Sequence, residues 1–138
     1  MLRGDGSLDE STPLQTFRGG VRHGRSGLMN ISHPLITLAI YPSGVELRST
    51  FRWLPIFPPW RARYEDLSVI EAIGRPDADG TDSALAPIQA RGVRFVGKAG
   101  GYMIFWCLNR DEVLAALAPH PVRIDYEPRP FRWLRPHR

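Results

Sequence analysis

The chain has 138 residues, of which 43% are hydrophobic and 23% are charged, and this composition suits one globular domain with its own core. A single cysteine excludes an internal disulfide, and neither a signal peptide nor a membrane-spanning apolar run is recognisable, so we expect a cytoplasmic protein. The net charge of +4 is concentrated in residues 120–138, which carry five arginines and two acids, whereas residues 34–119 are balanced at nine of each sign. Balanced charge on the folded part argues against a nucleic-acid-binding domain.

Three regions are predicted from these shifts in composition. Residues 1–32 are rich in glycine and arginine without a sustained apolar period, which predicts a flexible N-terminal segment. Residues 33–124 should form the folded domain, and residues 125–138 a basic tail rich in proline, arginine and aromatic residues.

The domain should open with a β-hairpin. Apolar residues 35–41 form a strand-sized run, and Pro42-Ser43-Gly44 is a turn sequence. Residues 45–52 then alternate with period two, with Val45 and Leu47 on one face and Glu46 and Arg48 on the other, as in a half-buried strand.

Four further strands and one helix are predicted beyond the hairpin. The proline-rich residues 53–60 exclude a central strand. The strands follow at residues 60–64, 67–73, 91–96 and 102–107, with a polar loop at 74–87 and a glycine-rich turn at 97–101. The helix should span residues 109–118, because Asn109 and Glu112 have the spacing of a capping box and Val113, Leu114 and Leu117 form an apolar face. We therefore predict a mainly β fold with one C-terminal helix.

Two segments resemble bacterial pleckstrin-homology-like (PH-like) and GRAM-like domains. They are RARYEDLSVIEAI at residues 61–73 and RGVRFVGKAGGYMIFWCLNRDEVLAAL at residues 91–117. The resemblance covers residues 34–119 and extends to small actinobacterial proteins of unassigned role, which suits the arginine-rich, lysine-poor usage. It implies a strongly curved antiparallel sheet, or open barrel, capped by the C-terminal helix.

The segment Gly92–Lys98 reads GxxxxGK, which resembles a phosphate-binding loop. That loop needs a serine or threonine after the lysine for Mg²⁺, followed by a helix, and here Ala99 and a predicted strand follow instead. The segment is therefore predicted to be a strand and a hairpin turn.

No other constellation predicts catalysis, a metal or a cofactor. The carboxylates of Asp77, Asp79 and Asp82 lack the spacing of a calcium loop, and the four histidines lie far apart. Cys107 lies in an apolar strand, where a thiol is buried and inert. We expect no enzyme activity and no small-molecule cofactor.

Two aromatic groups are candidate contact sites. Trp53, Phe57 and Trp60 could form a partner- or membrane-contact loop, but the favoured interpretation is that they pack over the open end of the barrel. In the tail, four arginines recur every third residue among prolines, which would align them on one ridge of a polyproline II helix. The residues that would make contact are Arg129, Phe131, Arg132, Trp133 and Arg135.

The functional prediction is a non-catalytic binding or scaffolding module that recruits a protein or peptide through its sheet surface. The alternative is a peripheral module at the inner membrane face that uses the tail, because arginines mixed with Trp and Phe suit an anionic surface. RNA or an acidic protein would satisfy the same charges. Another interpretation is that the tail is solvated or folds back on the sheet. Phosphoinositide binding of the eukaryotic kind is not expected, because the Pro42-Ser43-Gly44 turn carries no basic residue.

Overall fold

A computed structural model describes residues 12–23, 30–54, 58–74 and 91–129 of the chain. Within these ranges the elements are β1 (Gln15–His23), β2 (Asn30–Ile40), β3 (Gly44–Ser49), β4 (Trp60–Arg63), the 3₁₀ helix η1 (Tyr64–Asp66), β5 (Leu67–Ile73), β6 (Gly92–Gly97), β7 (Tyr102–Trp106), α1 (Arg110–Leu117) and β8 (Ile124–Arg129). The strands form one sheet in the order β4-β3-β2-β1-β7-β6-β5-β8. All neighbours are antiparallel except β5 and β8, which are parallel. The predicted mainly β fold with one helix near the C-terminus is confirmed.

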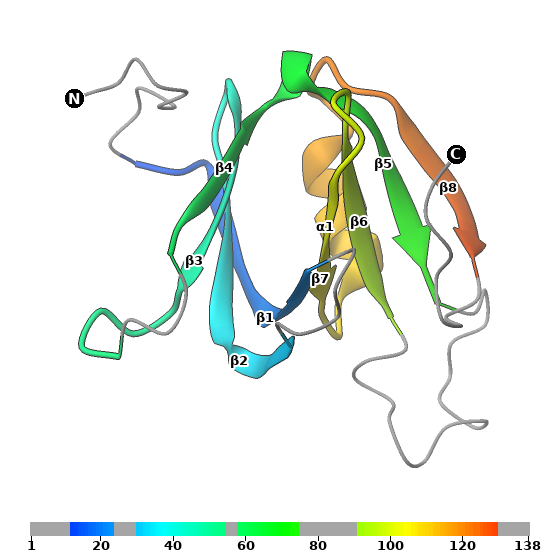
Figure 1. Cartoon of the computed structure of the whole chain (residues 1–138). Coiled ribbons are helices and arrows are strands. Elements are labelled where there is room, and N and C mark those ends of the chain that lie inside the picture. Colours follow the sequence, from blue (N-terminus) through cyan, green and yellow to red (C-terminus); the bar gives the residue numbers. More distant parts are fainter. Residues whose placement is uncertain (1–11, 24–29, 55–57, 75–90, 130–138) are drawn as a thin grey trace.

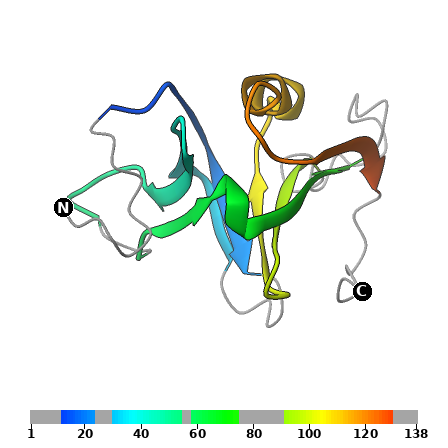
Figure 2. The same cartoon turned by 90° about the horizontal axis from the view of Figure 1, so that it is seen from above.

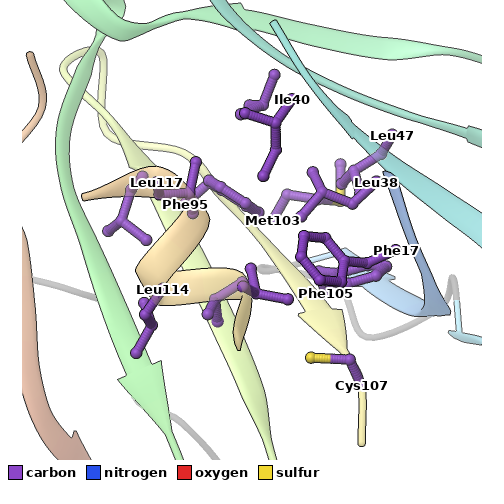
Figure 3. Packing of buried hydrophobic residues seen from close by; sticks show 14 of the residues in the cluster. Phe17, Leu38, Ile40, Leu47, Phe95, Met103, Phe105, Cys107, Leu114 and Leu117 are labelled. Carbon is purple, nitrogen blue, oxygen red and sulfur yellow. The ribbon is translucent and has the colours of Figure 1, made fainter. Parts of the chain in front are cut away.

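The sheet is open and strongly curved, and α1 lies against its concave side (Figures 1 and 2). One hydrophobic core fills the space between them, with aromatic and aliphatic side chains from both halves of the sheet (Figure 3). Its buried members include Phe17, Leu38, Leu47, Phe95, Phe105, Val113, Leu114 and Leu117. The three helix residues are those predicted to form its apolar face, so burial of that face holds α1 in place.

The predicted hairpins are confirmed. β2 pairs with β3, and β6 pairs with β7 through the turn at residues 97–101. In that turn the amide of Gly97 donates to the carbonyl of Gly101 over 2.8 Å, and Gly100 has a φ of 108°, a conformation that favours glycine. The GxxxxGK segment is thus a strand followed by a hairpin turn, as predicted.

The prediction of a flexible segment over residues 1–32 is wrong for Gln15–His23. This stretch forms β1, which lies between β2 and β7, and Phe17 and Val21 reach the core. Gly19 has a packing role, since a Cβ atom there would lie 2.0 Å from the carbonyl oxygen of Trp106. Glycine, taken as a loop signal, instead permits close contact between strands. The domain also begins earlier than residue 33, because β2 starts at Asn30.

The predicted boundary of the tail at residue 125 is also wrong. β8 covers Ile124–Arg129 and extends the sheet as a parallel partner of β5, with the amide of Ile70 donating to the carbonyl of Arg123 over 2.9 Å. A parallel partner that arrives after a helix cannot be inferred from a local pattern, because its pairing is set by the tertiary fold. Residues 130–138 lie outside the described part of the chain.

The predicted capping box at the start of α1 does not form. The Asn109 side chain makes no cap hydrogen bond, and its Nδ2 donates instead to Oε1 of Glu112 over 3.3 Å. Arg110 ties the helix start to the sheet, because its Nη1 donates to the carbonyl of Ile73 over 3.0 Å. Tertiary contacts therefore fix this helix more than its local cap does.

Among the described residues, none of the helical structure has the length and apolar character needed to cross a bilayer.

Candidate functional site

The structure separates the predicted aromatic group at residues 53–60. Trp60 lies in β4 and packs against the core, with its ring centroid 5.9 Å from that of Phe95, as the favoured interpretation expects. Trp53 points away from the core and is 76% exposed. Phe57 lies outside the described residues. The favoured interpretation is therefore wrong for Trp53, because a side chain this exposed does not pack over the end of the barrel.

The predicted tail site is described at one position. Arg129 is the last residue of β8 and lies opposite Ile73 of β5. Phe131, Arg132, Trp133 and Arg135, and with them most of the predicted arginine ridge, lie outside the described residues, as do Asp77, Asp79 and Asp82 of the acidic loop.

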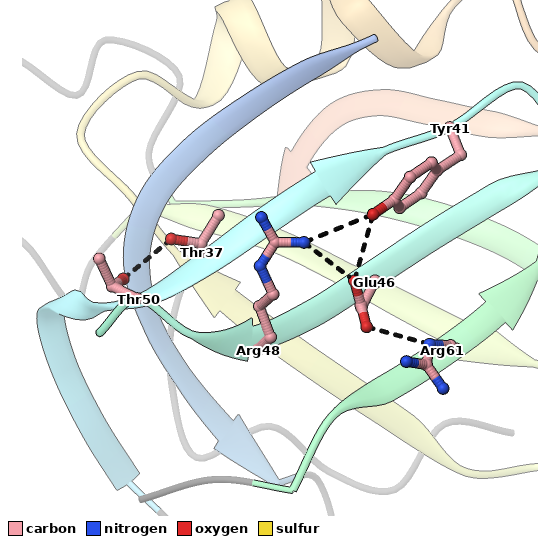
Figure 4. Close-up of polar contacts among 6 residues, drawn as sticks. All are labelled: Thr37, Tyr41, Glu46, Arg48, Thr50 and Arg61. Atoms are coloured by element: carbon pink, nitrogen blue, oxygen red, sulfur yellow. Dashed lines mark hydrogen bonds and ion pairs between the residues drawn. The ribbon is translucent and has the colours of Figure 1, made fainter. Parts of the chain in front are cut away.

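A group of arginines that the prediction did not single out lies on the outer face of β1–β4. At its centre is Glu46 of β3, whose carboxylate is held from both sides (Figure 4). Arg48 donates through Nη1 to Oε1 over 3.0 Å, and Arg61 of β4 donates through Nε to Oε2 over 3.0 Å. The hydroxyl of Tyr41 also donates to Oε1 over 3.4 Å. Each carboxylate oxygen thus has its own guanidinium, an arrangement that fixes both arginines.

The cluster is buried at its centre and open at its rim. The Glu46 side chain is 8% exposed, whereas those of Arg48 and Arg61 are 37% and 47% exposed. Two half-exposed guanidiniums share one buried carboxylate, so positive charge remains on the solvent side. The surface can therefore attract an anion.

Arg18 of β1 adds a third positive charge to the same face. Phe17 and Leu38 are paired and point into the core, so the next pair, Arg18 and Thr37, points outward. Thr37 pairs in turn with Arg48 on β3. Arg18, Thr37 and Arg48 thus form one cross-strand row, and we call the surface made by Arg18, Arg48 and Arg61 around Glu46 the arginine face.

Two threonines fix the floor of this row. Thr50 donates its hydroxyl proton to the carbonyl of Pro34 over 2.8 Å, so in the 2.9 Å bond between Thr37 and Thr50 the donor is Thr37 (Figure 4). The amide of Thr50 also donates to the carbonyl of Leu35 over 2.8 Å. These bonds join the end of β3 to β2 and make this part of the surface rigid.

An exposed aromatic turn follows the arginine face. The amide of Leu54 donates to the carbonyl of Phe51 over 3.0 Å, which closes a turn over residues 51–54. Trp53 stands in this turn, and its ring centroid lies 5.6 Å from that of Phe51. An exposed tryptophan close in sequence to a basic surface is typical of a contact site.

The sequence contained part of this signal. Alternation over residues 45–52 predicted that Glu46 and Arg48 share a face. In the next predicted strand, Arg61 alternates with Trp60 and Ala62 and so lies on the other face of that strand. The convergence of two arginines on Glu46 depends on the β3–β4 register, which pairs Glu46 with Arg61. Arg18 could not be added, because its strand was not predicted.

The thiol of Cys107 is not suited to nucleophilic chemistry. Burial raises its pKa from an ordinary value of 9.0 to about 12, and the opposing effects of the Asn109 amide and of Arg110 and Arg91 are smaller. The residue is free and buried at the end of β7. A protonated, inaccessible thiol is neither a nucleophile nor a metal ligand. No group of three or more histidine, cysteine or acidic side chains that could hold a metal lies within the described ranges.

Comparisons of this chain with family models, with curated proteins and with solved structures found no match in any of the three. The arginine face and its surroundings are therefore the features of the molecule that indicate a function.

Proposed function

We propose that this chain is a non-catalytic binding module of PH-like build that recruits a protein or peptide partner through the outer face of β1–β4. The curved sheet with a helix against its concave side supports the PH-like build. It leaves the convex side of β1–β4 free of any described helix, so partner contact there does not disturb the core.

The observation that carries the proposal is the arginine face. Sheet surfaces of stable domains present charges of both signs, yet here two arginines hold one buried carboxylate and a third, Arg18, lies on the same face. Because Glu46 orients Arg48 and Arg61 before any partner arrives, less side-chain entropy is lost on binding. Preorganised arginines beside an exposed tryptophan are the residue types that dominate protein interfaces.

A peptide-display selection against the full chain tests the proposal. Enriched peptides should bind the purified protein, and the variant Arg61→Glu should weaken that binding at least about tenfold, because it replaces a cation of the arginine face with an anion. Lys98→Glu is the matched control, since it makes the same charge change in the exposed β6–β7 turn. The absence of any enriched binder, or equal loss in both variants, would contradict the proposal.

A further inference from the structure

The spacing of the cross-strand row defines a site for one anionic group. Arg18 and Arg48 lie on the two strands that flank β2, and Thr37 lies between them in register. Adjacent strands are about 4.8 Å apart, so the two arginine backbones are separated by about 10 Å. Two long guanidinium side chains at that spacing can both reach an anion placed above the central residue.

Thr37 forms the floor of this site. Thr37 is a small residue, is buried, and already donates its hydroxyl proton to Thr50. Its hydroxyl therefore offers no donor to an anion. The anion would be held by the guanidiniums on either side.

The two arginines have donors to spare. Nη1 of Arg48 contacts Glu46 and Tyr41, and among the described residues no partner contacts the remainder of that guanidinium. The side chain of Arg18 is exposed and forms no ion pair with the residues that the structure describes. A guanidinium has five N–H donors, so both can bind an added carboxylate while the Glu46 contacts persist.

On the basis of the proposed function, we infer that the partner is an acidic segment of a protein, and that one of its aspartate or glutamate carboxylates docks above Thr37 between Arg18 and Arg48. Arg61 supplies a second cation for a neighbouring acidic residue, and the 51–54 turn supplies an apolar contact through Trp53. The segment would lie extended across the convex outer face of β1–β4.

The geometry favours an acidic peptide over an anionic membrane. Membrane attraction follows net charge and amounts to about 1 kcal/mol for each basic residue near the surface, and Glu46 neutralises one of the three arginines. Discrete carboxylates can instead use the directional, paired hydrogen bonds of fixed guanidiniums. The single exposed tryptophan of the turn would add little insertion into a bilayer.

The test uses a synthetic peptide in which glutamate alternates with serine, and a matched peptide with glutamine in place of glutamate. Titration of the full chain, followed by calorimetry and by tryptophan fluorescence, should give binding at least about tenfold tighter for the glutamate peptide. Arg18→Gln should remove most of that difference, and it should not affect folding, because no described contact depends on this side chain. Arg48→Lys keeps the charge beside Glu46 and should still weaken binding, because lysine lacks the planar fork.

Lys98→Gln is the control and should leave the affinity for the glutamate peptide unchanged. Equal weakening by Lys98→Gln and Arg18→Gln would overturn the inference, since binding would then follow net charge alone. The chain could instead bind vesicles containing phosphatidylserine more tightly than it binds the glutamate peptide. If that binding also depends on Arg18, the inference is overturned in favour of a membrane partner. If display-selected peptides bind without dependence on Arg18 and Arg48, the carboxylate site is wrong while the binding-module function stands. If no peptide binds at all, the proposed function fails as well.

Discussion

Glu71 of β5 and Arg94 of β6 lie directly opposite each other and form an ion pair from which water is almost completely excluded. Nε of Arg94 donates to Oε1 of Glu71 over 2.7 Å, and the two side chains are 5% and 2% exposed. The guanidinium also lies 4.8 Å from the ring centroid of Tyr102, while its Nη1 is buried and has no hydrogen-bond partner among the residues that the structure describes. The pair therefore differs from the half-exposed ion pairs of the arginine face.

Replacement of one member of this pair should destabilise the fold strongly. In Glu71→Gln the positive charge of Arg94 stays buried without its counter-charge, and such a loss costs about 3–5 kcal/mol. Urea denaturation followed by circular dichroism would measure the decrease. The double variant Glu71→Leu/Arg94→Met should recover much of the loss, because it leaves neither of these two buried charges unpaired.

The pair between Arg63 and Glu65 provides the matched control. These side chains are 3.5 Å apart and largely exposed, so Arg63→Gln should change the free energy of unfolding by less than about 1 kcal/mol. Similar losses in Glu71→Gln and Arg63→Gln would contradict the prediction, because burial would then not increase the contribution of an ion pair to stability.

The sequence was most informative where neighbouring residues determine the structure. The β2–β3 and β6–β7 hairpins were predicted because alternation and turn residues are local signals. The helix was predicted from its apolar face, although the cap at Asn109 does not form. β1 and β8 were missed because each joins the sheet through partners far away in the sequence. The same limit applies to the arginine face, which combines residues of β1, β3 and β4 through strand register.

Gly92 should be irreplaceable for a steric reason. A Cβ atom at this position would lie 2.2 Å from the carbonyl oxygen of Phe105 and 3.0 Å from Cα of Trp106, and backbone atoms in a paired strand cannot move aside cheaply. We expect Gly92→Ala to lower the free energy of unfolding by about 1–3 kcal/mol or more. Thermal denaturation of the purified variant would measure the effect.

Gly101 serves as the control for Gly92. A Cβ atom there would meet no atom within 4 Å, so Gly101→Ala should have a small effect on the melting temperature. Comparable destabilisation by both substitutions would show that glycine at position 92 matters for reasons other than the close approach of β6 and β7.

Leu117 should be one of the residues through which α1 is attached to the sheet. It is fully buried in the core that the helix shares with β6, and Leu117→Ala should cost about 2–5 kcal/mol, since a cavity remains beside Phe95 and its neighbours. Leu108 precedes the helix and is exposed, so Leu108→Ala should cost far less. Equal sensitivity at the two positions in urea denaturation would contradict the attachment of α1 through its apolar face.

Cys107 should make the protein less stable at alkaline pH. Burial raises its pKa from 9.0 to about 12, so between these values the unfolded chain loses the thiol proton while the folded chain retains it. The folded state then binds more protons than the unfolded state, and the free energy of unfolding falls as the pH rises through this window. Cys107→Ala removes this contribution, so the stability difference between wild type and variant should shrink as the pH rises from 9 to 11.

A thiol reagent at pH 8 should label the folded chain slowly and the urea-unfolded chain rapidly, because the buried thiol is both protonated and inaccessible. Rapid labelling of the folded chain, or a stability difference that does not change with pH, would mean that the thiol is open to solvent.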